Sequence, residues 1–269
     1  MRNQSHPINF TSKRKYFLHL LLDITVNRNS CSSHLISYSY GSIICGMKIK
    51  LYHGSPVIVR KPLFGVGKTY NDYGKGFYCT ESLDLAKEWS VDEGRDGFAN
   101  VYSLETDGLN VVHLNEAPFC IMHWLSVLLQ HREFELDTDL AAEAREYVLS
   151  RFPVDLSDAD AVVGYRADDS YFTFARNFLN GGITLSKLSE AMQLGKLGLQ
   201  FMLKSKRVFD RIAFEEAIPA AASEWYPLKK GRDDEARRSY RDIRRDRERN
   251  GLYITRILEE EMTADDLRI

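Results

Sequence analysis

Two groups of side chains have residue types and spacing suited to holding a ligand. The first is Tyr52-His53-Gly54-Ser55, where an imidazole and a hydroxyl flank a glycine whose bare backbone a ligand amide could approach closely. The second is an aromatic pair: Tyr78, which ends Tyr73-Gly74-Lys75-Gly76-Phe77-Tyr78, and Trp89, eleven residues further on. Two such rings can sandwich a flat cation by burial, stacking and cation–π attraction. Each residue alone is more typical of a protein core, so the prediction of a site depends on their order and spacing.

This order and spacing resemble the NAD site of the ADP-ribosyltransferase superfamily. Its poly-ADP-ribose and diphtheria-toxin-like branches combine a Tyr-His-Gly start, a Gly-Lys-Gly-x-Tyr strand and a second aromatic residue at a similar distance. Two later stretches, Gly164 to Phe172 and Leu197-Gly198-Leu199-Gln200, are similar to those of the DUF3990 proteins, a bacterial branch of that superfamily. The resemblance covers roughly Met47 to Ile269.

The resemblance implies an enzyme that cleaves NAD, releases nicotinamide and transfers ADP-ribose to a protein or nucleic-acid acceptor. NAD would be a co-substrate bound by His53, Gly54, Ser55, Tyr78 and Trp89, and no metal is expected. The imidazole could donate to a ribose hydroxyl, and the Ser55 hydroxyl could bond the carboxamide. DUF3990 proteins look like bacterial toxins or effectors, which implies a neutralising antitoxin or immunity partner.

The catalytic residues are less regular. Where the superfamily's catalytic glutamate is expected, the sequence has Gln200, with no Glu beside it. An amide can accept a hydrogen bond from a ribose hydroxyl. Being neutral, it lacks the Coulombic stabilisation that a carboxylate gives to a developing positive charge, which is on the order of several kcal/mol in a dry site. Asp168 and Asp169 are the candidates to supply that charge or to position the acceptor. The alternative for this pair is a solvated turn or a helix cap.

The missing glutamate keeps other functions open. A glycohydrolase would use the same pocket with water in place of the acceptor. A degenerate module would bind NAD or ADP-ribose without turnover, and an interaction protein would keep the fold without the ligand. Nicotinamide release and NAD binding distinguish these alternatives.

Alternation of Ile49 and Leu51 with Lys48 and Lys50 predicts the first of the strands that position these side chains, and strand signals recur further along the chain. A strand beginning near Met47 is expected to end at His53, where a turn follows. The other strands are predicted at Gly76 to Thr80, Phe98 to Glu105, Leu109 to Leu114, Ala161 to Tyr165, Leu199 to Lys204 and Arg211 to Glu215. Asp107-Gly108 is a favourable turn pair and predicts a hairpin between the third and fourth strands.

The spacing of residues predicts helices in four regions. One helix follows the capping residue Ser82, and another lies between Thr184 and Gly195. Residues 118–152 are interpreted as a helical insertion. The run Lys229 to Arg249 has ten basic and six acidic residues, which predicts an exposed, salt-bridged helix that packs only near Leu252.

The fold class is therefore α+β. By resemblance it would be an ADP-ribosyltransferase-like split β-sandwich over residues 47–228, with the insertion at about 118–152 and a charged helical extension at 229–269. Residues 1–46 are rich in Ser and Asn and lack a sustained period, so they are interpreted as a poorly structured extension or a mis-called start at a true Met47.

Composition places the chain among globular proteins. Hydrophobic residues make up 44% and charged residues 28%, and the formal net charge is -2, which gives no reason to expect a membrane or nucleic acid as an obligatory partner. The four cysteines lack Cys-x-x-Cys spacing, so reduced thiols are expected. The apolar run Tyr16 to Leu22 is too short to span a bilayer and lacks a cleavage site. A cytoplasmic location is expected.

Overall fold

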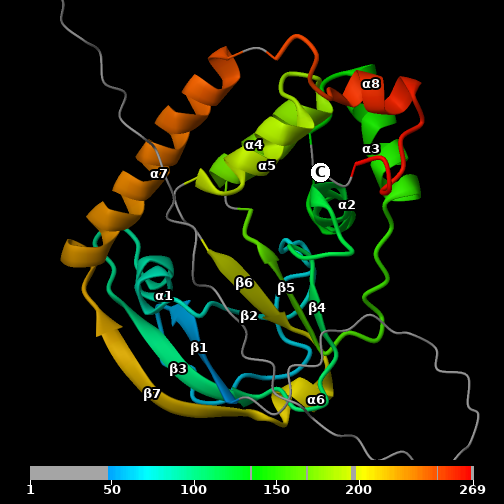
Figure 1. Ribbon diagram of the computed structural model, residues 1–269. Coiled ribbons are helices and arrows are strands. Elements are labelled where there is room, and N and C mark those ends of the chain that lie inside the picture. The colour runs from blue at the N-terminus through cyan, green and yellow to red at the C-terminus, as the bar shows by residue number, and fades with distance from the viewer. Residues whose placement is uncertain (1–47, 134, 168, 195–197, 247, 268–269) are drawn as a thin grey trace, which may run out of the picture. The chain divides into compact units, whose positions relative to one another are not determined.

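Two β-sheets and a layer of helices make up the fold of the computed structural model, which describes residues 48–133, 135–167, 169–194, 198–246 and 248–267, without the side chains of 169–171. The first sheet has the order β1-β3-β7, with β1 at Lys48–Ser55, β3 at Gly97–Glu105 and β7 at Ile212–Ala220. The second has the order β2-β6-β5-β4, with β2 at Phe77–Cys79, β6 at Leu199–Leu203, β5 at Ala161–Tyr165 and β4 at Val111–His113. Figure 1 shows the two sheets below most of the helices. The predicted α+β class is confirmed.

The two sheets face each other across a small apolar core. Successive strand residues point to opposite faces, so Ala161 and Val163 contact one layer while Val162 contacts the other. The first pair belongs to the core between the sheets with Leu51 and Leu104, whereas Val162 packs against the helices. The isolated bridge between Tyr52 and Thr80 joins β1 to the end of β2.

The predicted hairpin around Asp107-Gly108 is wrong. The chain does turn there, since the Leu109 amide donates to the Thr106 carbonyl at 3.0 Å, but β3 and β4 lie in different sheets. The reason is a long-range contact: the Asp160 carboxylate accepts from the Asn110 amide at 2.7 Å and draws β4 alongside β5, with which it pairs in parallel. β1 also continues past His53 to Ser55, two residues further than predicted.

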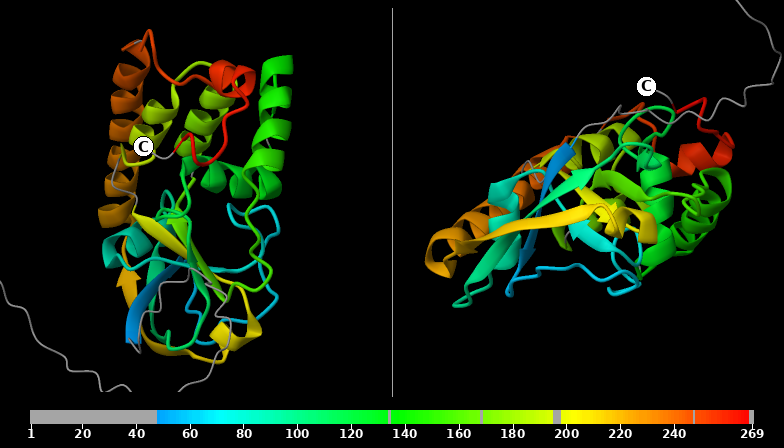
Figure 2. Two further views of the ribbon diagram at one scale, coloured as in Figure 1. Left: turned by 45° about the vertical axis from the view of Figure 1, so that its right-hand side comes forward. Right: turned by 90° about the horizontal axis from the view of Figure 1, so that it is seen from below.

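Most of the helices cover one end of the sheets, whereas the short helix at residues 206–209 lies at the opposite end (Figure 2). The bounds are α1 Leu83–Ser90, α2 Ile121–His131, α3 Asp139–Arg151, α4 Asp169–Leu179, α5 Leu185–Ala191, α6 Lys206–Phe209, α7 Ala222–Arg245 and α8 Ile254–Glu259. The predicted caps are confirmed, because Ser82 accepts from the Leu85 amide and Thr184 from the Lys187 amide. Helices α2 and α3 lie within the predicted helical segment 118–152. Gly195, the predicted end of the helix after Thr184, lies outside the described residues.

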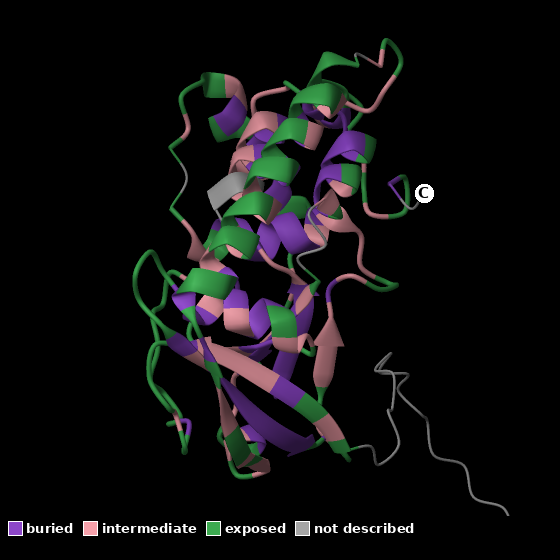
Figure 3. Ribbon diagram, turned by 90° about the vertical axis from the view of Figure 1, so that its left-hand side faces the viewer, coloured by how far each residue is buried: buried purple, intermediate pink, exposed green. Residues whose placement is uncertain are grey.

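Helix α7 corrects the prediction for the charged C-terminal run. It begins at Ala222 rather than near Lys229, and it packs along its length through Trp225, Ala236 and Tyr240, which are all buried. The Tyr240 ring stacks on Phe174 with centroids 3.9 Å apart. These contacts are few and widely spaced, so they leave no continuous apolar stripe in the sequence. The outer side of α7 is exposed (Figure 3).

Within the described ranges no helix has a stretch long and apolar enough to cross a membrane. The predicted N-terminal extension lies in residues 1–47, outside the part of the chain that the structure describes.

Candidate functional site

One large cavity, of about 1290 Å³, brings together the predicted ligand-binding residues. Its walls include His53, Gly54 and Ser55 from β1, Tyr78 from β2 and Trp89 from α1. Gln200, at the start of β6, lines the same cavity. Residues more than a hundred positions apart in the sequence therefore share one site. Of the two acids predicted beside them, Asp168 lies outside the described residues and Asp169 begins α4 with its side chain undescribed.

The hydrogen bond at His53 determines what its imidazole can offer a ligand. Nδ1 lies 2.7 Å from the Tyr78 carbonyl oxygen, which can accept but not donate, so Nδ1 carries the proton. Burial lowers the pKa of His53, which keeps the ring neutral at neutral pH. Nε2 is then a hydrogen-bond acceptor. The expectation that His53 donates to a ribose hydroxyl is reversed: the hydroxyl would donate to Nε2.

Gly54 is required by helix packing. A Cβ at this position would lie 2.2 Å from the Ala86 carbonyl oxygen and 2.9 Å from the Ser90 amide nitrogen. Both atoms belong to the α1 backbone, which therefore lies directly against β1. Gly54 therefore allows α1 to approach β1 closely. This packing places Trp89 and His53 in the same wall of the cavity. The idea that a ligand amide explains this glycine is not needed.

The two aromatic residues of the predicted clamp are held in different ways. The Tyr78 hydroxyl donates to the Gly74 carbonyl at 2.6 Å and accepts from the Tyr73 amide at 3.1 Å, and burial raises its pKa. The ring of Trp89 has the Arg166 guanidinium 4.3 Å from its centroid. One face of Trp89 is therefore already covered by a cation. A nicotinamide ring would have to use the other face or displace Arg166.

The indole N–H of Trp89 is a buried donor with no hydrogen-bond partner among the described residues. A buried polar group without a partner costs about 1–3 kcal/mol. Trp89 lines the cavity, but its N–H group is covered, so an acceptor atom on a bound ligand would reach it only where a neighbouring side chain moves aside.

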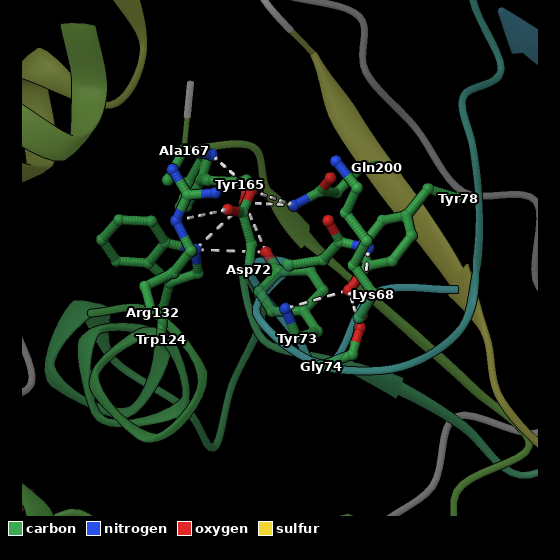
Figure 4. Close-up of polar contacts among 11 residues, drawn as sticks. Lys68, Asp72, Tyr73, Gly74, Tyr78, Trp124, Arg132, Tyr165, Ala167 and Gln200 are labelled. Atoms are coloured by element: carbon green, nitrogen blue, oxygen red, sulfur yellow. Dashed lines mark hydrogen bonds and ion pairs between the residues drawn. The ribbon is translucent and has the colours of Figure 1, made fainter. Parts of the chain in front are cut away.

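Gln200 is bonded to a carboxylate that the sequence analysis did not single out. Its side-chain nitrogen donates to Asp72 Oδ2 at 2.9 Å and to the Tyr165 carbonyl oxygen at 3.3 Å (Figure 4). Asp72 also accepts from the Ala167 amide at 2.9 Å, and Arg132 Nε lies 3.7 Å from its other oxygen. Burial raises the pKa of Asp72, while these hydrogen bonds and the nearby guanidinium groups oppose the rise.

A buried network fixes the backbone that carries Asp72. The hydroxyl of its neighbour Tyr73 donates to the Tyr165 carbonyl and accepts from Trp124 Nε1 at 3.1 Å. A Cβ at Gly164 would lie 2.5 Å from the Tyr73 hydroxyl oxygen, so β5 needs a glycine here to let the ring pack. Asp72 directly precedes the quoted run from Tyr73 to Tyr78, and an acid beside a buried motif is the signal that could have found it.

The rim of the cavity is rich in cations. Three acidic cavity residues are already engaged: Asp72 as described, Glu88 with Arg232 of α7 at 2.7 and 2.9 Å, and Asp233 with Arg237 at 2.8 Å. Eight basic residues line the cavity against four acidic ones, an excess of positive charge that suits a ligand with phosphate groups. The basic residues are Lys61, Lys68, Arg132, Arg166, Lys229, Lys230, Arg232 and Arg237.

Comparison with known proteins gives one match. The profile of a family described as "Protein of unknown function (DUF3990)" matches residues 49–214. No curated protein and no solved structure matches the chain. Among the described residues, no group of three or more His, Cys, Asp or Glu side chains is placed to hold a metal ion.

Proposed function

Since the chain belongs to the DUF3990 family, whose function is unknown, we propose from the chemistry of its cavity that it is an NAD-dependent ADP-ribosyltransferase. The reaction would break the bond between ribose and nicotinamide, and nicotinamide would leave with the bonding electron pair. An acceptor atom of a protein or nucleic acid would form a bond to the same ribose carbon and release a proton.

The observation that carries the proposal is the gathering of complementary groups in one cavity. Sugar hydroxyls are hydrogen-bond donors, and the cavity offers His53 Nε2 and the Gln200 side-chain carbonyl as acceptors. The unsatisfied indole N–H of Trp89 would suit a carbonyl oxygen, such as that of a carboxamide. The excess of Lys and Arg suits a pyrophosphate. The volume, about 1290 Å³, is above the range of roughly 300–1000 Å³ of small-molecule and cofactor pockets, so the cavity has room for a dinucleotide.

These groups also suit the chemical step. The ribose becomes positively charged as nicotinamide leaves, so groups that stabilise positive charge increase the rate. The carbonyl dipole of Gln200, backed by the Asp72 carboxylate, would lie on the side of that charge. Tyr78 and the face of Trp89 opposite Arg166 would exclude water from the leaving ring.

From the resemblance of its residue order to the ADP-ribosyltransferase superfamily, we also propose that the fold is the split β-sandwich of that superfamily. On the same ground, we propose that the protein acts as a bacterial toxin or effector with a neutralising partner.

The test is nicotinamide release from NAD labelled in its adenylate group, by the full-length protein with and without cell lysate. We expect release together with transfer of label to macromolecules. His53→Ala should reduce both, because the ribose loses an acceptor, whereas His113→Ala, at a histidine of β4 outside the cavity, should reduce neither.

Gln200 supports a second candidate, a module that binds NAD or ADP-ribose without turnover. It predicts NAD binding that depends on His53 with no nicotinamide release. Release of free ADP-ribose without transfer would instead identify a glycohydrolase. No binding of NAD by the wild-type protein would contradict the proposal in all its forms.

A further inference from the structure

Resting on the proposed function, we infer that Asp72 and Gln200 together replace the single catalytic glutamate that this kind of site is expected to have. Asp72 orients the Gln200 amide so that its carbonyl oxygen serves the ligand, and it supplies the negative charge that an amide lacks. Asp72 is a positioning residue in this arrangement, because it acts through Gln200.

The orientation of the amide follows from its partners. Gln200 Nε2 lies 2.9 Å from a carboxylate oxygen of Asp72 and 3.3 Å from the carbonyl oxygen of Tyr165. Both partners are acceptors, so rotating the amide by half a turn would place its oxygen against two oxygens. The nitrogen therefore faces Asp72, and the carbonyl oxygen is directed away from it (Figure 4).

The strand pattern places the amide on the correct side of the sheet. Gln200 and Met202 are two positions apart on β6 and so share a face. Met202 packs in the core that the helices form on this face, while Phe201 packs in the core between the sheets. Gln200 is buried on the helical side, at the cavity, where a ligand would meet its carbonyl group.

Asp72 is the cavity acid that can supply the charge to Gln200. Glu88 bonds Arg232 rather than Gln200, and the other two acids of the cavity lie on α7. Asp72 is tied to Gln200 directly, and the Ala167 amide and Arg132 hold its carboxylate in place. A charge buried at this distance acts through a medium of low polarity, so water screens it little.

Exchanging the two side-chain types tests the inference. Asp72→Asn should fold but bind NAD about tenfold more weakly, because an Asn side chain can turn its own NH₂ group toward Gln200 and free the amide to rotate. Gln200→Glu places a second carboxylate near Asp72, so its folding equilibrium constant at neutral pH should fall roughly tenfold or more. The double variant Asp72→Asn/Gln200→Glu again has one carboxylate and one amide, and it should recover both quantities to within about threefold.

NAD affinity is measured by calorimetry and the folding equilibrium by urea denaturation. Gln130→Glu, the same substitution at an exposed position of α2, should change neither. Rescue in the double variant distinguishes positioning from a general structural effect, since two independent structural defects would add. Kinetics should show a larger loss in kcat than in affinity for Asp72→Asn.

The outcomes separate this inference from the proposed function. If the wild-type protein binds NAD and Asp72→Asn binds it equally well, the inference is overturned and the proposed function stands. If Gln200→Glu is as stable as the wild type, the pairing itself is overturned. If the wild type does not bind NAD, the proposed function fails and the inference fails with it.

Discussion

Arg232 of α7 donates two hydrogen bonds, of 2.9 and 2.7 Å, to the carboxylate of Glu88 on α1. The Glu88 side chain is only 4% exposed, whereas that of Arg232 is 28% exposed. The pair therefore joins two helices in the wall of the cavity through a charge that water scarcely reaches. Such a pair is sensitive to removal of one partner, because the other charge is left buried and uncompensated.

Arg232→Met should lower the free energy of unfolding by about 3 kcal/mol, measured by urea denaturation at neutral pH. The double variant Glu88→Gln/Arg232→Met should be more stable than Arg232→Met, since no charge remains buried. Arg256→Met is the control, because Arg256 pairs with Glu260 at an exposed position of α8. An Arg232→Met protein as stable as this control would contradict the prediction.

His53 should make the stability depend on pH in a defined direction. Burial lowers the pKa of the folded His53 below the ordinary value of 6.5, so below that value the unfolded chain binds a proton that the folded site resists. Stability is therefore complete above pH 6.5 and is lost as the pH falls through the window below it. Denaturation at about pH 7.5 and about pH 5.5 should show a larger loss for the wild type than for His53→Gln.

His131 also has a pKa lowered by burial, but it is present in both proteins and cancels in the comparison. Equal losses in the two proteins would show that His53 is not protected from protonation. NAD affinity should fall only at the acidic end of this window, where the pH reaches the lowered pKa of the folded His53 and a protonated Nε2 cannot accept from a hydroxyl.

Trp89→Phe separates the ring of Trp89 from its N–H group. The variant keeps an aromatic face but lacks the donor that has no partner among the described residues. We expect NAD affinity to fall about tenfold by calorimetry while the unfolding free energy changes by less than about 1 kcal/mol. Trp225→Phe, at a buried indole of α7 that does not line the cavity, should leave affinity unchanged. Unchanged affinity in Trp89→Phe would remove the N–H group from the site.

Gly164→Ala should be destabilising. The new methyl group would lie 2.5 Å from the Tyr73 hydroxyl oxygen, which is buried and hydrogen-bonded, so either the ring or β5 must shift. A loss of about 2 kcal/mol is expected. Gly231→Ala provides the contrast, because its Cβ would meet no atom within 4 Å in the middle of α7. That substitution should stabilise the protein by about 0.5–1 kcal/mol through helix propensity. Similar effects of the two substitutions would contradict the prediction.

The local part of this fold was predictable from the sequence. The strand signal at Ala161 to Tyr165 identified β5 at its observed bounds, and the caps at Ser82 and Thr184 depend on side chains within three residues of the atoms they bond. The contacts between distant segments were not predictable. Asp160 pairs β4 with β5 through an atom fifty residues away, and no feature of the turn at Asp107-Gly108 signals this.

The same distinction applies to the site. The order of His53, Tyr78 and Trp89 along the chain indicated one cavity, and the structure places all three in it. Asp168 and Asp169 were the acids expected to supply the charge that Gln200 lacks. The acid that is hydrogen-bonded to Gln200 is Asp72, which is 128 positions away in the sequence, so only the folded chain brings the two together.

Part of the cavity wall comes from a segment that the family profile does not match. The family profile matches residues 49–214, yet Lys229, Lys230 and Arg232 line the cavity from α7. A chain could therefore exchange this helix for another and alter the entrance while the strands beneath it stay the same. The selectivity for the ligand that enters the cavity would then evolve separately from the chemistry of the residues inside it.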